Sequence, residues 1–303
     1  MLFLKKLFFR PNFIAFYREN GTYKLLNERY KNEKIIFNEN KEFNNKKELI
    51  KYINSIIKLN PQTYTSTILK SINQGVVHSC KKNFFKEMEL DINNIKYICI
   101  NNKYSFYTSL YELLELQKEF PFLDFLYSPF SIIDYKAKIR DNSLYILIMR
   151  DFLFFMIYKD SIPVFGEIEE INEKTQENEG EGEIEEIEEI NELDLLDEMN
   201  EDISKIESIE DIDNIEGVSK TDRLTSIENL NIENKIFNKL QEVLKEYYEQ
   251  NPYFIEKIVI YDNITINKSI KSIIEDELFI DTTIEKINLL KIINEISKKC
   301  IVL

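Results

Sequence analysis

The chain has little of what many enzyme sites require, with six glycines, six prolines, three cysteines and one histidine among 303 residues. So few glycines and prolines argue against a loop-rich all-β fold and against a phosphate site that depends on glycine. The G-x-S-x-G, H-E-x-x-H, Walker A and G-x-G-x-x-G motifs are missing from the sequence. The sequence therefore assigns no catalytic, cofactor-binding or metal-binding residue.

The three cysteines, Cys80, Cys99 and Cys300, lie far apart, and none belongs to a C-x-x-C pair. This spacing argues against a disulfide framework and a cysteine zinc site, and it suits a reducing compartment. Cys99 and Cys300 stand in apolar runs, where buried free thiols are expected. His78 precedes Cys80 by two residues on one face of an expected strand, so an exposed or partnered histidine is favoured over a His–Cys dyad.

Long apolar segments are missing as well. The longest runs cover 144–149 and 152–158, far short of the roughly 20 residues that span a bilayer. Residues 1–9 are apolar apart from two lysines, but this run ends at Arg10, which is too early for the apolar core of a signal peptide. We therefore expect a cytoplasmic protein without a membrane span.

Charge is divided unevenly along the chain, which has 39 basic and 54 acidic residues and a net charge of −15. Residues 166–217 hold 23 acidic residues and two lysines, so the rest of the chain is mildly basic. Residues 1–90 alone hold 17 basic and eight acidic residues. The Glu-Ile run 166–217 is expected to be a flexible, disordered insertion, and an adaptor role for it, binding a basic partner, stays open.

Apolar residues make up 44% of the chain and aromatic residues 13%, which is enough for a sizeable core. A turn at Glu19–Gly21 joins the first two expected strands. The periodicity predicts strands at 13–17, 23–26, 64–69, 95–100, 122–127, 144–149, 153–158, 162–165, 254–261 and 279–280. It predicts helices at 45–59, 104–118, 128–137, 227–248, 269–278 and 284–299. Several strands are apolar on both faces, which is typical of the central sheet of an α/β layer fold.

Two stretches carry a resemblance to a known family. The first runs from YICINNKYSFYTSLYELLELQKEFPFLDFLYSPFSIID to SLYILIMRDFLFFMIYKDSIPVFGEI, and the second is KLQEVLKEYYEQNPYFIEKIVIYDNITINKSIKSIIEDELFI. In element order and apolar pattern, over about residues 95–168 and 228–300, they resemble the actin-like PilM proteins of type IV pilus assembly. They resemble the cytoplasmic domains of type II secretion GspL proteins more distantly.

The resemblance implies an α/β, actin-like (RNase H-like) fold of two lobes, with mixed central sheets flanked by helices. The first lobe would comprise residues 1–138, and the second residues 139–165 plus 226–303. The acidic insertion, residues 166–225, falls where the family builds a smaller subdomain.

The chain departs from the family at the turns that hold the nucleotide. Actin-like ATPases use Asp and Gly there because backbone N–H groups must approach the phosphates closely. Here the segment 15–18 has neither residue, 148–152 has Asp151 but no Gly, and 261–264 has Asp262 and Asn263 where the family has Gly-Gly. These losses favour a degenerate protein that is not an enzyme and has no cofactor. An ATPase with an unconventional site, in which Asp151 and Asp262 hold Mg²⁺ through water, stays open as the alternative.

The resemblance further implies a scaffold at the inner face of a bacterial cytoplasmic membrane. It would bind the cytoplasmic tail of a PilN-like bitopic inner-membrane protein, and the surface of residues 64–110 is where we expect that tail. The host machine would be a type IV pilus, a type II secretion or DNA-uptake system, or a flagellar motor with pilus-derived parts. Peripheral contact with the membrane is expected, and a homo-oligomer or ring stays open. Nucleic acid is not an expected partner, because the basic residues of 1–90 form no basic stripe.

Overall fold

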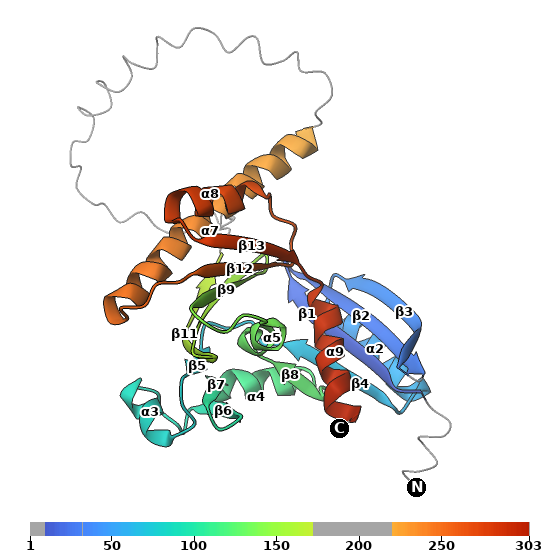
Figure 1. The fold of residues 1–303 in the computed structure, drawn as a ribbon. Coiled ribbons are helices and arrows are strands. Elements are labelled where there is room, and N and C mark those ends of the chain that lie inside the picture. The colour runs from blue at the N-terminus through green and yellow to red at the C-terminus, as the bar shows by residue number, and fades with distance from the viewer. Residues whose placement is uncertain (1–9, 32, 172–219, 303) are drawn as a thin grey trace, which may run out of the picture. The chain divides into compact units, whose positions relative to one another are not determined.

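The computed structural model describes residues 10–31, 33–171 and 220–302. Residue contacts divide the chain into two compact units, residues 1–172 with 232–303, and residues 173–231. All described strands lie in the first unit (Figure 1). Most of the acidic insertion lies outside the described residues, so its disorder stays a prediction.

The first sheet contains five strands in the order β3-β2-β1-β4-β8. Asn20 and Gly21 join β1 to β2 with φ values of 46° and 75°, the left-handed conformation of a tight hairpin turn. The predicted hairpin is therefore confirmed. Strand β3 was not predicted, because its sequence shows no apolar alternation and none of its residues is buried. The strands are β1 Asn12–Glu19, β2 Thr22–Lys31, β3 Lys34–Phe43, β4 Thr63–Ile68 and β8 Phe125–Tyr127.

Two helices cover the first sheet. Helix α2, Lys46–Leu59, matches the helix predicted at 45–59 except that Asn45 is its N-cap, whose side chain accepts a 2.9 Å hydrogen bond from the N–H of Glu48. It ends at Asn60, whose N–H bonds to the carbonyl of Ile56. Helix α9, Leu289–Val302, lies on the opposite face, against β1 and β4 (Figure 1).

A separate three-stranded sheet has the order β5-β7-β6 and is antiparallel throughout. The predicted helix 104–118 is wrong in its first six residues, because 104–109 form the central strand of this sheet. Tyr104 and Phe106 alternate into the core, and Asn101 and Asn102, with φ of 49° and 58°, form the turn from β6. The elements are β5 Gln74–Val77, α3 Lys82–Glu87, β6 Ile95–Ile100, β7 Tyr104–Ser109 and α4 Leu110–Glu119.

A disulfide joins Cys80 to Cys99 across this sheet, with their Cα atoms 5.4 Å apart. The sequence-based argument against a disulfide is therefore wrong. Chain spacing could not reveal the pairing, which depends on β7 lying between the two cysteine-bearing segments. Ser105 of β7 stands opposite Cys99 in register, and its hydroxyl donates to the carbonyl of Ser79 beside Cys80. Cys300 is a free, exposed cysteine rather than a buried one.

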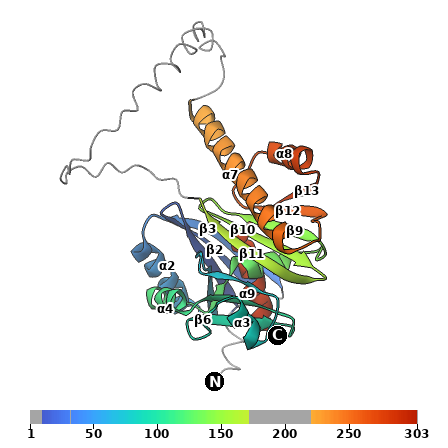
Figure 2. The same cartoon turned by 90° about the vertical axis from the view of Figure 1, so that its left-hand side faces the viewer.

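The second large sheet has the order β11-β10-β9-β12-β13, and β12 runs parallel to both of its neighbours (Figure 2). Every residue of β9 is buried, because helices cover both faces as the apolar strands predict. One face packs on α7 and α8, and the other packs on α5 and α9. The elements are β9 Ser143–Ile148, β10 Phe152–Lys159, β11 Ile162–Glu170, β12 Lys257–Asp262, β13 Asp281–Lys286, α5 Pro129–Lys136, α7 Lys220–Gln250 and α8 Ser269–Leu278.

Several element bounds differ from those that the sequence predicts. Strand β11 continues to Glu170 and α7 begins at Lys220, so both enter the predicted insertion 166–225. The predicted helix 284–299 begins too early, because 281–286 form strand β13 in parallel register with β12. The spacing of apolar residues in this segment fits a helix, and only pairing with β12 selects the strand.

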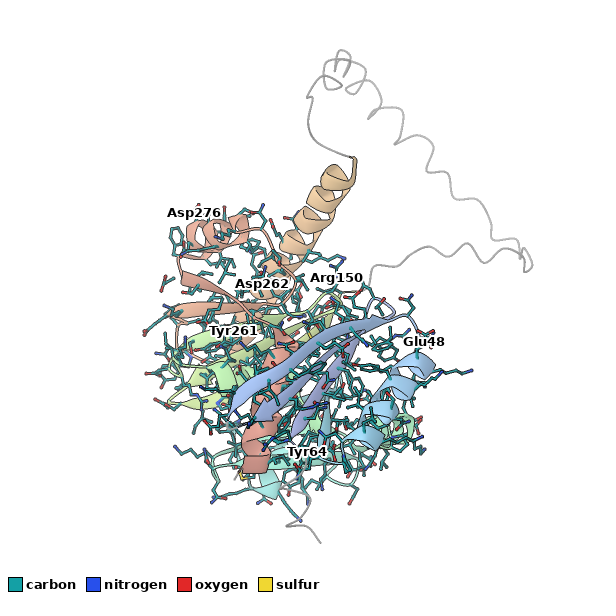
Figure 3. The ribbon with its side chains drawn as sticks, turned by 90° about the vertical axis from the view of Figure 1, so that its right-hand side faces the viewer. Glu48, Tyr64, Arg150, Tyr261, Asp262 and Asp276 are labelled. Atoms are coloured by element: carbon teal, nitrogen blue, oxygen red, sulfur yellow. A yellow bond between two sulfur atoms is a disulfide. The ribbon has the colours of Figure 1, made fainter. Side chains whose placement is uncertain are left out.

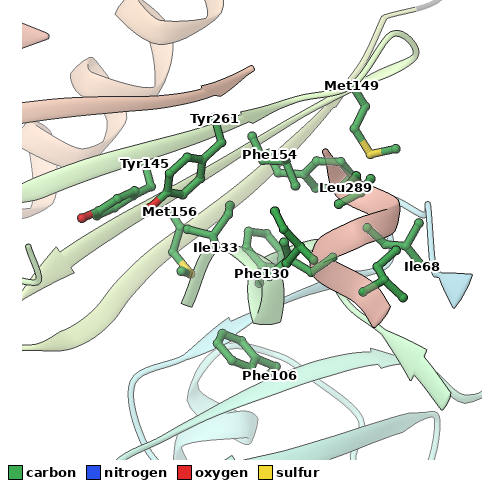
Figure 4. Close-up of a cluster of buried hydrophobic side chains, with 14 of the residues drawn as sticks. Ile68, Phe106, Phe130, Ile133, Tyr145, Met149, Phe154, Met156, Tyr261 and Leu289 are labelled. Atoms are coloured by element: carbon green, nitrogen blue, oxygen red, sulfur yellow. The ribbon is translucent and has the colours of Figure 1, made fainter. Parts of the chain in front are cut away.

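One hydrophobic core joins the three sheets (Figure 4). It contains Ile68 of the first sheet, Phe106 of the small sheet, and Phe154 and Tyr261 of the second sheet, all at most 7% exposed. Phe130 of α5 and side chains of α9 fill the space between them. Because interiors are closely packed, this shared core holds the surrounding surface in a fixed arrangement. Among the described helices, none combines the length and apolar content that crossing a membrane requires.

Candidate functional site

The three turns that the family resemblance brings together do meet in the structure. The N–H of Asn263, directly after β12, donates to the carbonyl of Ile148 at the end of β9, at 3.3 Å. Its side-chain amide donates to the hydroxyl of Tyr17 in β1 at 3.0 Å. Arg150 follows β9 at the end of the strand that lies beside Asp262, the last residue of β12 (Figure 3). Residues from both large sheets therefore converge at Asn263.

The carboxylate of Asp262 is hydrogen-bonded to the loop that follows it. It accepts hydrogen bonds from the backbone N–H groups of Ile264, Thr265 and Ile266 at 2.9, 2.7 and 3.1 Å, and the residue is only 4% exposed. Such hydrogen bonds satisfy the buried charge and fix the loop. The side chain of Asp262 therefore fixes a turn at which the resemblance to actin-like proteins led us to expect a glycine pair.

Asp151 has a different partner. Its carboxylate forms an ion pair with Lys70, whose ammonium group lies 5.8 Å from the ring centre of Phe152. The two aspartates of the Mg²⁺ hypothesis are thus held by separate sets of groups. Within the described ranges, no group of three or more His, Cys, Asp or Glu residues is placed to hold a metal ion.

A cleft of 600 Å³ opens beside this convergence, between β2, β3 and the start of α9. Its lysines are partly neutralised, since Lys24 pairs with Glu19 and Lys41 pairs with Glu39 at 3.0 Å. Burial, followed by the charge of Glu19, raises the pKa of Tyr17 to about 12. The lining residues are Tyr17, Lys24, Leu25, Asn40, Lys41, Glu42, Asn263, Lys286, Ile287, Asn288 and Leu290.

A second hollow, which we call the α4 groove, has a volume of 380 Å³ and lies between the segment 69–72 and helix α4. The segment 69–72 falls within the surface 64–110 where a partner tail is expected. The remaining residues come from α4, β10 and β11. The α4 groove is lined by Leu69, Lys70, Ser71, Ile72, Tyr111, Glu112, Glu115, Leu116, Glu119, Phe152 and Glu170.

Four carboxylates line the α4 groove. Glu112 is fixed in place, because Ser71 donates to one of its oxygens and Asn73 donates to the other at 2.7 Å. Glu115 and Glu119 follow on the same face of α4, where they pair with Lys118 at 2.6 Å and Lys46 at 3.1 Å. Together with Glu170 they make this surface acidic.

Apolar side chains accompany these carboxylates. Ile72 is 59% exposed and Tyr111 is 72% exposed, while Leu116 and Phe152 are half-buried beneath them. Exposed apolar groups that gather around a hollow mark interaction surfaces more often than isolated ones do. The arrangement suits a segment with apolar side chains for the floor and basic side chains for the rim.

His78 and Cys80 do not form a reactive pair. His78 is exposed, and its ring meets the ring of Phe84 edge to face at 5.2 Å between centres. The sulfur of Cys80 is bonded to Cys99. Sequence analysis missed the acidic face of α4, although the spacing of Glu112, Glu115 and Glu119 was available as a signal.

Two family models match the chain. One, described as Domain of unknown function (DUF8569), matches residues 9–134. The other, described as Domain of unknown function (DUF8341), matches residues 144–301, which is more than half of the chain. The chain belongs to the DUF8341 family. The lobe boundary predicted at residue 138 falls between the two matches and stays a prediction. No match is found among the curated proteins.

Solved structures show what fold this DUF8341 chain has. The structure of the PilM–PilN type IV pilus biogenesis complex is 10% identical and covers 94% of this chain and 90% of that chain, with a TM-score of 0.50. At this identity the likeness shows the fold alone. The expected fold class, α/β and actin-like with two lobes, is therefore confirmed.

Two further structures are similar over nearly the whole chain. A protein of unknown function with an actin-like ATPase fold, from Bacteroides thetaiotaomicron, is 8% identical and covers 97% of this chain and 96% of that chain, with a TM-score of 0.45. The ethanolamine utilization protein EutJ from Carboxydothermus hydrogenoformans is 10% identical, with coverages of 94% and 88% and a TM-score of 0.44.

Proposed function

We propose that this protein is a non-catalytic cytoplasmic scaffold whose α4 groove binds the cytoplasmic tail of a PilN-like bitopic inner-membrane protein. The observation that carries the proposal is the groove itself, with apolar side chains between four carboxylates on a PilM-like fold. The protein would thereby connect an envelope-spanning machine to the cytoplasm. Its host would be a type IV pilus, a type II secretion-like system or a flagellar motor accessory structure.

The charge of the α4 groove suits such a partner. Cytoplasmic segments next to a membrane span carry an excess of Lys and Arg, so the tail of a bitopic protein is basic near the membrane. Glu115 and Glu119 are paired with exposed lysines, and exchanging these for residues of the tail costs little, because exposed ion pairs are weak. Burial of Tyr111, which is 72% exposed, would supply apolar area.

The turn residues support the absence of catalysis in this proposal. The carboxylate of Asp262 accepts hydrogen bonds from backbone N–H groups, and that of Asp151 pairs with Lys70. The side-chain amide of Asn263 donates to Tyr17. A nucleotide-binding turn needs backbone N–H groups that are open to phosphate oxygens. In this chain, the backbone N–H groups of residues 264–266 donate to the carboxylate of Asp262 instead.

Affinity purification from detergent-solubilised membranes of the source cells tests the proposed function. The intact protein should retain a bitopic protein with a basic cytoplasmic tail, and Tyr111→Ala should lose it. Tyr253→Ala is the matched control, since Tyr253 is a 47% exposed tyrosine that does not line the groove. Equal recovery by both variants would contradict the assignment of the α4 groove.

The 600 Å³ cleft favours a second candidate, an actin-like ATPase with an unconventional site. This candidate predicts that Mg·ATP raises the melting temperature and that Asp151→Ala abolishes the rise. The scaffold proposal predicts no shift with Mg·ATP or Mg·ADP.

A further inference from the structure

Exposed apolar residues gather at one end of the first sheet. Ile35, Ile36 and Phe37 are 44%, 52% and 40% exposed at the start of β3, the edge strand. Leu59, at the end of α2, is 80% exposed. Exposed apolar side chains in a group need a partner that removes them from water.

Basic residues surround this apolar group. Arg10, Lys31, Lys34 and Lys58 are exposed, and Lys298 is half-buried. Within the part of the chain that the structure describes, none of the five forms an ion pair. We call these five cations, together with Ile35, Ile36, Phe37 and Leu59, the basic end.

Hydrogen bonds show that the segments of the basic end are neighbours. The side chain of Asn60, directly after Leu59, donates to the carbonyl of Arg10 at 2.8 Å. Lys31 and Lys34 face each other across the β2–β3 hairpin. Lys298, near the C-terminal end of α9, donates to the carbonyl of Glu33 in this hairpin at 3.4 Å. Three distant parts of the chain thus form one surface.

We propose that the basic end binds an anionic lipid surface directly. An anionic bilayer attracts Lys and Arg within a Debye length, and its interface accepts apolar side chains beside them. The basic end offers both kinds of group together. Glu33 is the one acidic residue of segment 29–38 around the hairpin turn, and the five cations of the basic end outnumber it.

The neighbouring sequence fits the same partner. The chain enters the described structure at Arg10, within the basic end. The nine residues before Arg10 comprise seven apolar residues and two lysines, a composition suited to a lipid interface. A second copy of the chain suits the surface less well, because a two-fold contact would set the same five cations against each other.

Lipid binding at the basic end goes beyond the scaffold function and does not depend on it. The α4 groove and the basic end share no residue. A protein with a defective groove should still bind lipid, and a protein with a defective basic end should still bind the partner tail. The failure of one proposal is therefore distinguishable from the failure of the other.

Vesicle co-sedimentation of the full chain tests the inference. Vesicles with equal parts of phosphatidylcholine and phosphatidylglycerol should sediment the protein, whereas vesicles of phosphatidylcholine alone should not. The double charge reversal Lys34→Glu with Lys58→Glu should weaken binding by about fivefold or more for each lysine, because each contributes through the surface potential. Leu59→Ser should weaken it separately, without a change in charge.

Matched controls are Lys245→Glu and Lys268→Glu, exposed lysines on α7 and directly before α8 that belong to neither surface. They should bind anionic vesicles as the unmodified protein does, as should the groove variant Tyr111→Ala. The inference is overturned if the unmodified protein ignores anionic vesicles, or if the basic-end and control variants lose binding equally. It is also overturned if the protein does not bind vesicles and instead forms a dimer, which Ile36→Ser dissociates.

Discussion

The side-chain amide of Asn263 donates a 3.0 Å hydrogen bond to the hydroxyl of Tyr17 and so joins the two large sheets. The same side chain accepts from the N–H of Leu289 at 3.0 Å, at the start of α9. One asparagine therefore links β1, β12 and α9. Asn263, where the resemblance led us to expect a glycine, is thus a structural connection between the two large sheets.

Burial of the Tyr17 hydroxyl predicts a dependence of stability on alkaline pH. The pKa of Tyr17 is raised to about 12 in the folded state, above its ordinary value of 10.0. The folded state keeps the proton more tightly, so its contribution is full below pH 10 and is lost as pH rises through about 12. Tyr17→Phe should flatten the fall in unfolding free energy over this window, measured by urea denaturation. An unchanged slope would contradict the burial of this hydroxyl.

Loss of Asn263 should weaken the same connection. Asn263→Ala removes a donor to Tyr17 and an acceptor for Leu289, so we expect about 1–2 kcal/mol of destabilisation. Asn267→Ala is the control within the same loop, because its side chain accepts one exposed hydrogen bond from Ser269. Comparable losses in both variants would show that the loop, rather than the link to Tyr17, determines stability.

The half-buried carboxylate of Asp134 should be more sensitive still. Asp134 accepts hydrogen bonds from Tyr104 at 2.8 Å and Tyr158 at 2.6 Å, and Arg140 lies 3.3 Å away. Asp134→Ala leaves three donors without this acceptor, so we expect about 2–4 kcal/mol of destabilisation in chemical denaturation. Asp276→Ala, on the exposed face of α8, should change stability by less than about 0.5 kcal/mol.

Because of the disulfide, we expect reducing conditions to lower the stability of the protein. Cys80 and Cys99 are 19 residues apart, and a loop of this size is worth about 3 kcal/mol in the chain-entropy description. Dithiothreitol should lower the denaturant midpoint of the intact protein, and the double variant Cys80→Ser with Cys99→Ser should not respond. If the intact protein is equally insensitive, the bond contributes nothing to stability.

Charge in the α4 groove should control recognition of the tail. Glu115→Lys replaces an attractive charge by a repulsive one, so affinity for a basic tail peptide should fall about fivefold to tenfold, and more at low salt. Glu277→Lys, an exposed position on α8, is the matched control. Fluorescence anisotropy with the tail of the copurified bitopic protein measures both. Equal affinity of the two variants would exclude Glu115 from the contact.

The sequence predicts those elements whose signals are local. Helix α2 has a capping asparagine before it, an Asn-Pro pair after it and apolar residues at helical spacing, and α8 is predicted with its observed bounds. Strand β7 was predicted as helix because Tyr107, Leu110 and Tyr111 also fit helical spacing. Its true state depends on pairing with β5 and β6, which lie elsewhere in the chain.

The candidate site is only partly predictable for the same reason. The family resemblance indicates the surface 64–110, and four of the eleven residues that line the α4 groove lie in it. Phe152 and Glu170 belong to the second sheet, and only the tertiary fold brings them to the groove. The Cys80–Cys99 pair likewise depends on strand order, which spacing along the chain does not reveal.

Site-specific photo-crosslinking in the source cells tests the central claim most directly. A photoreactive phenylalanine analogue replaces Tyr111 in the α4 groove, or Tyr253 as the control, and mass spectrometry identifies the crosslinked peptide. The account predicts a crosslink from position 111, and none from position 253, to the cytoplasmic tail of a bitopic inner-membrane protein. A crosslink from position 111 only to soluble proteins, or the same tail captured from both positions, would contradict it.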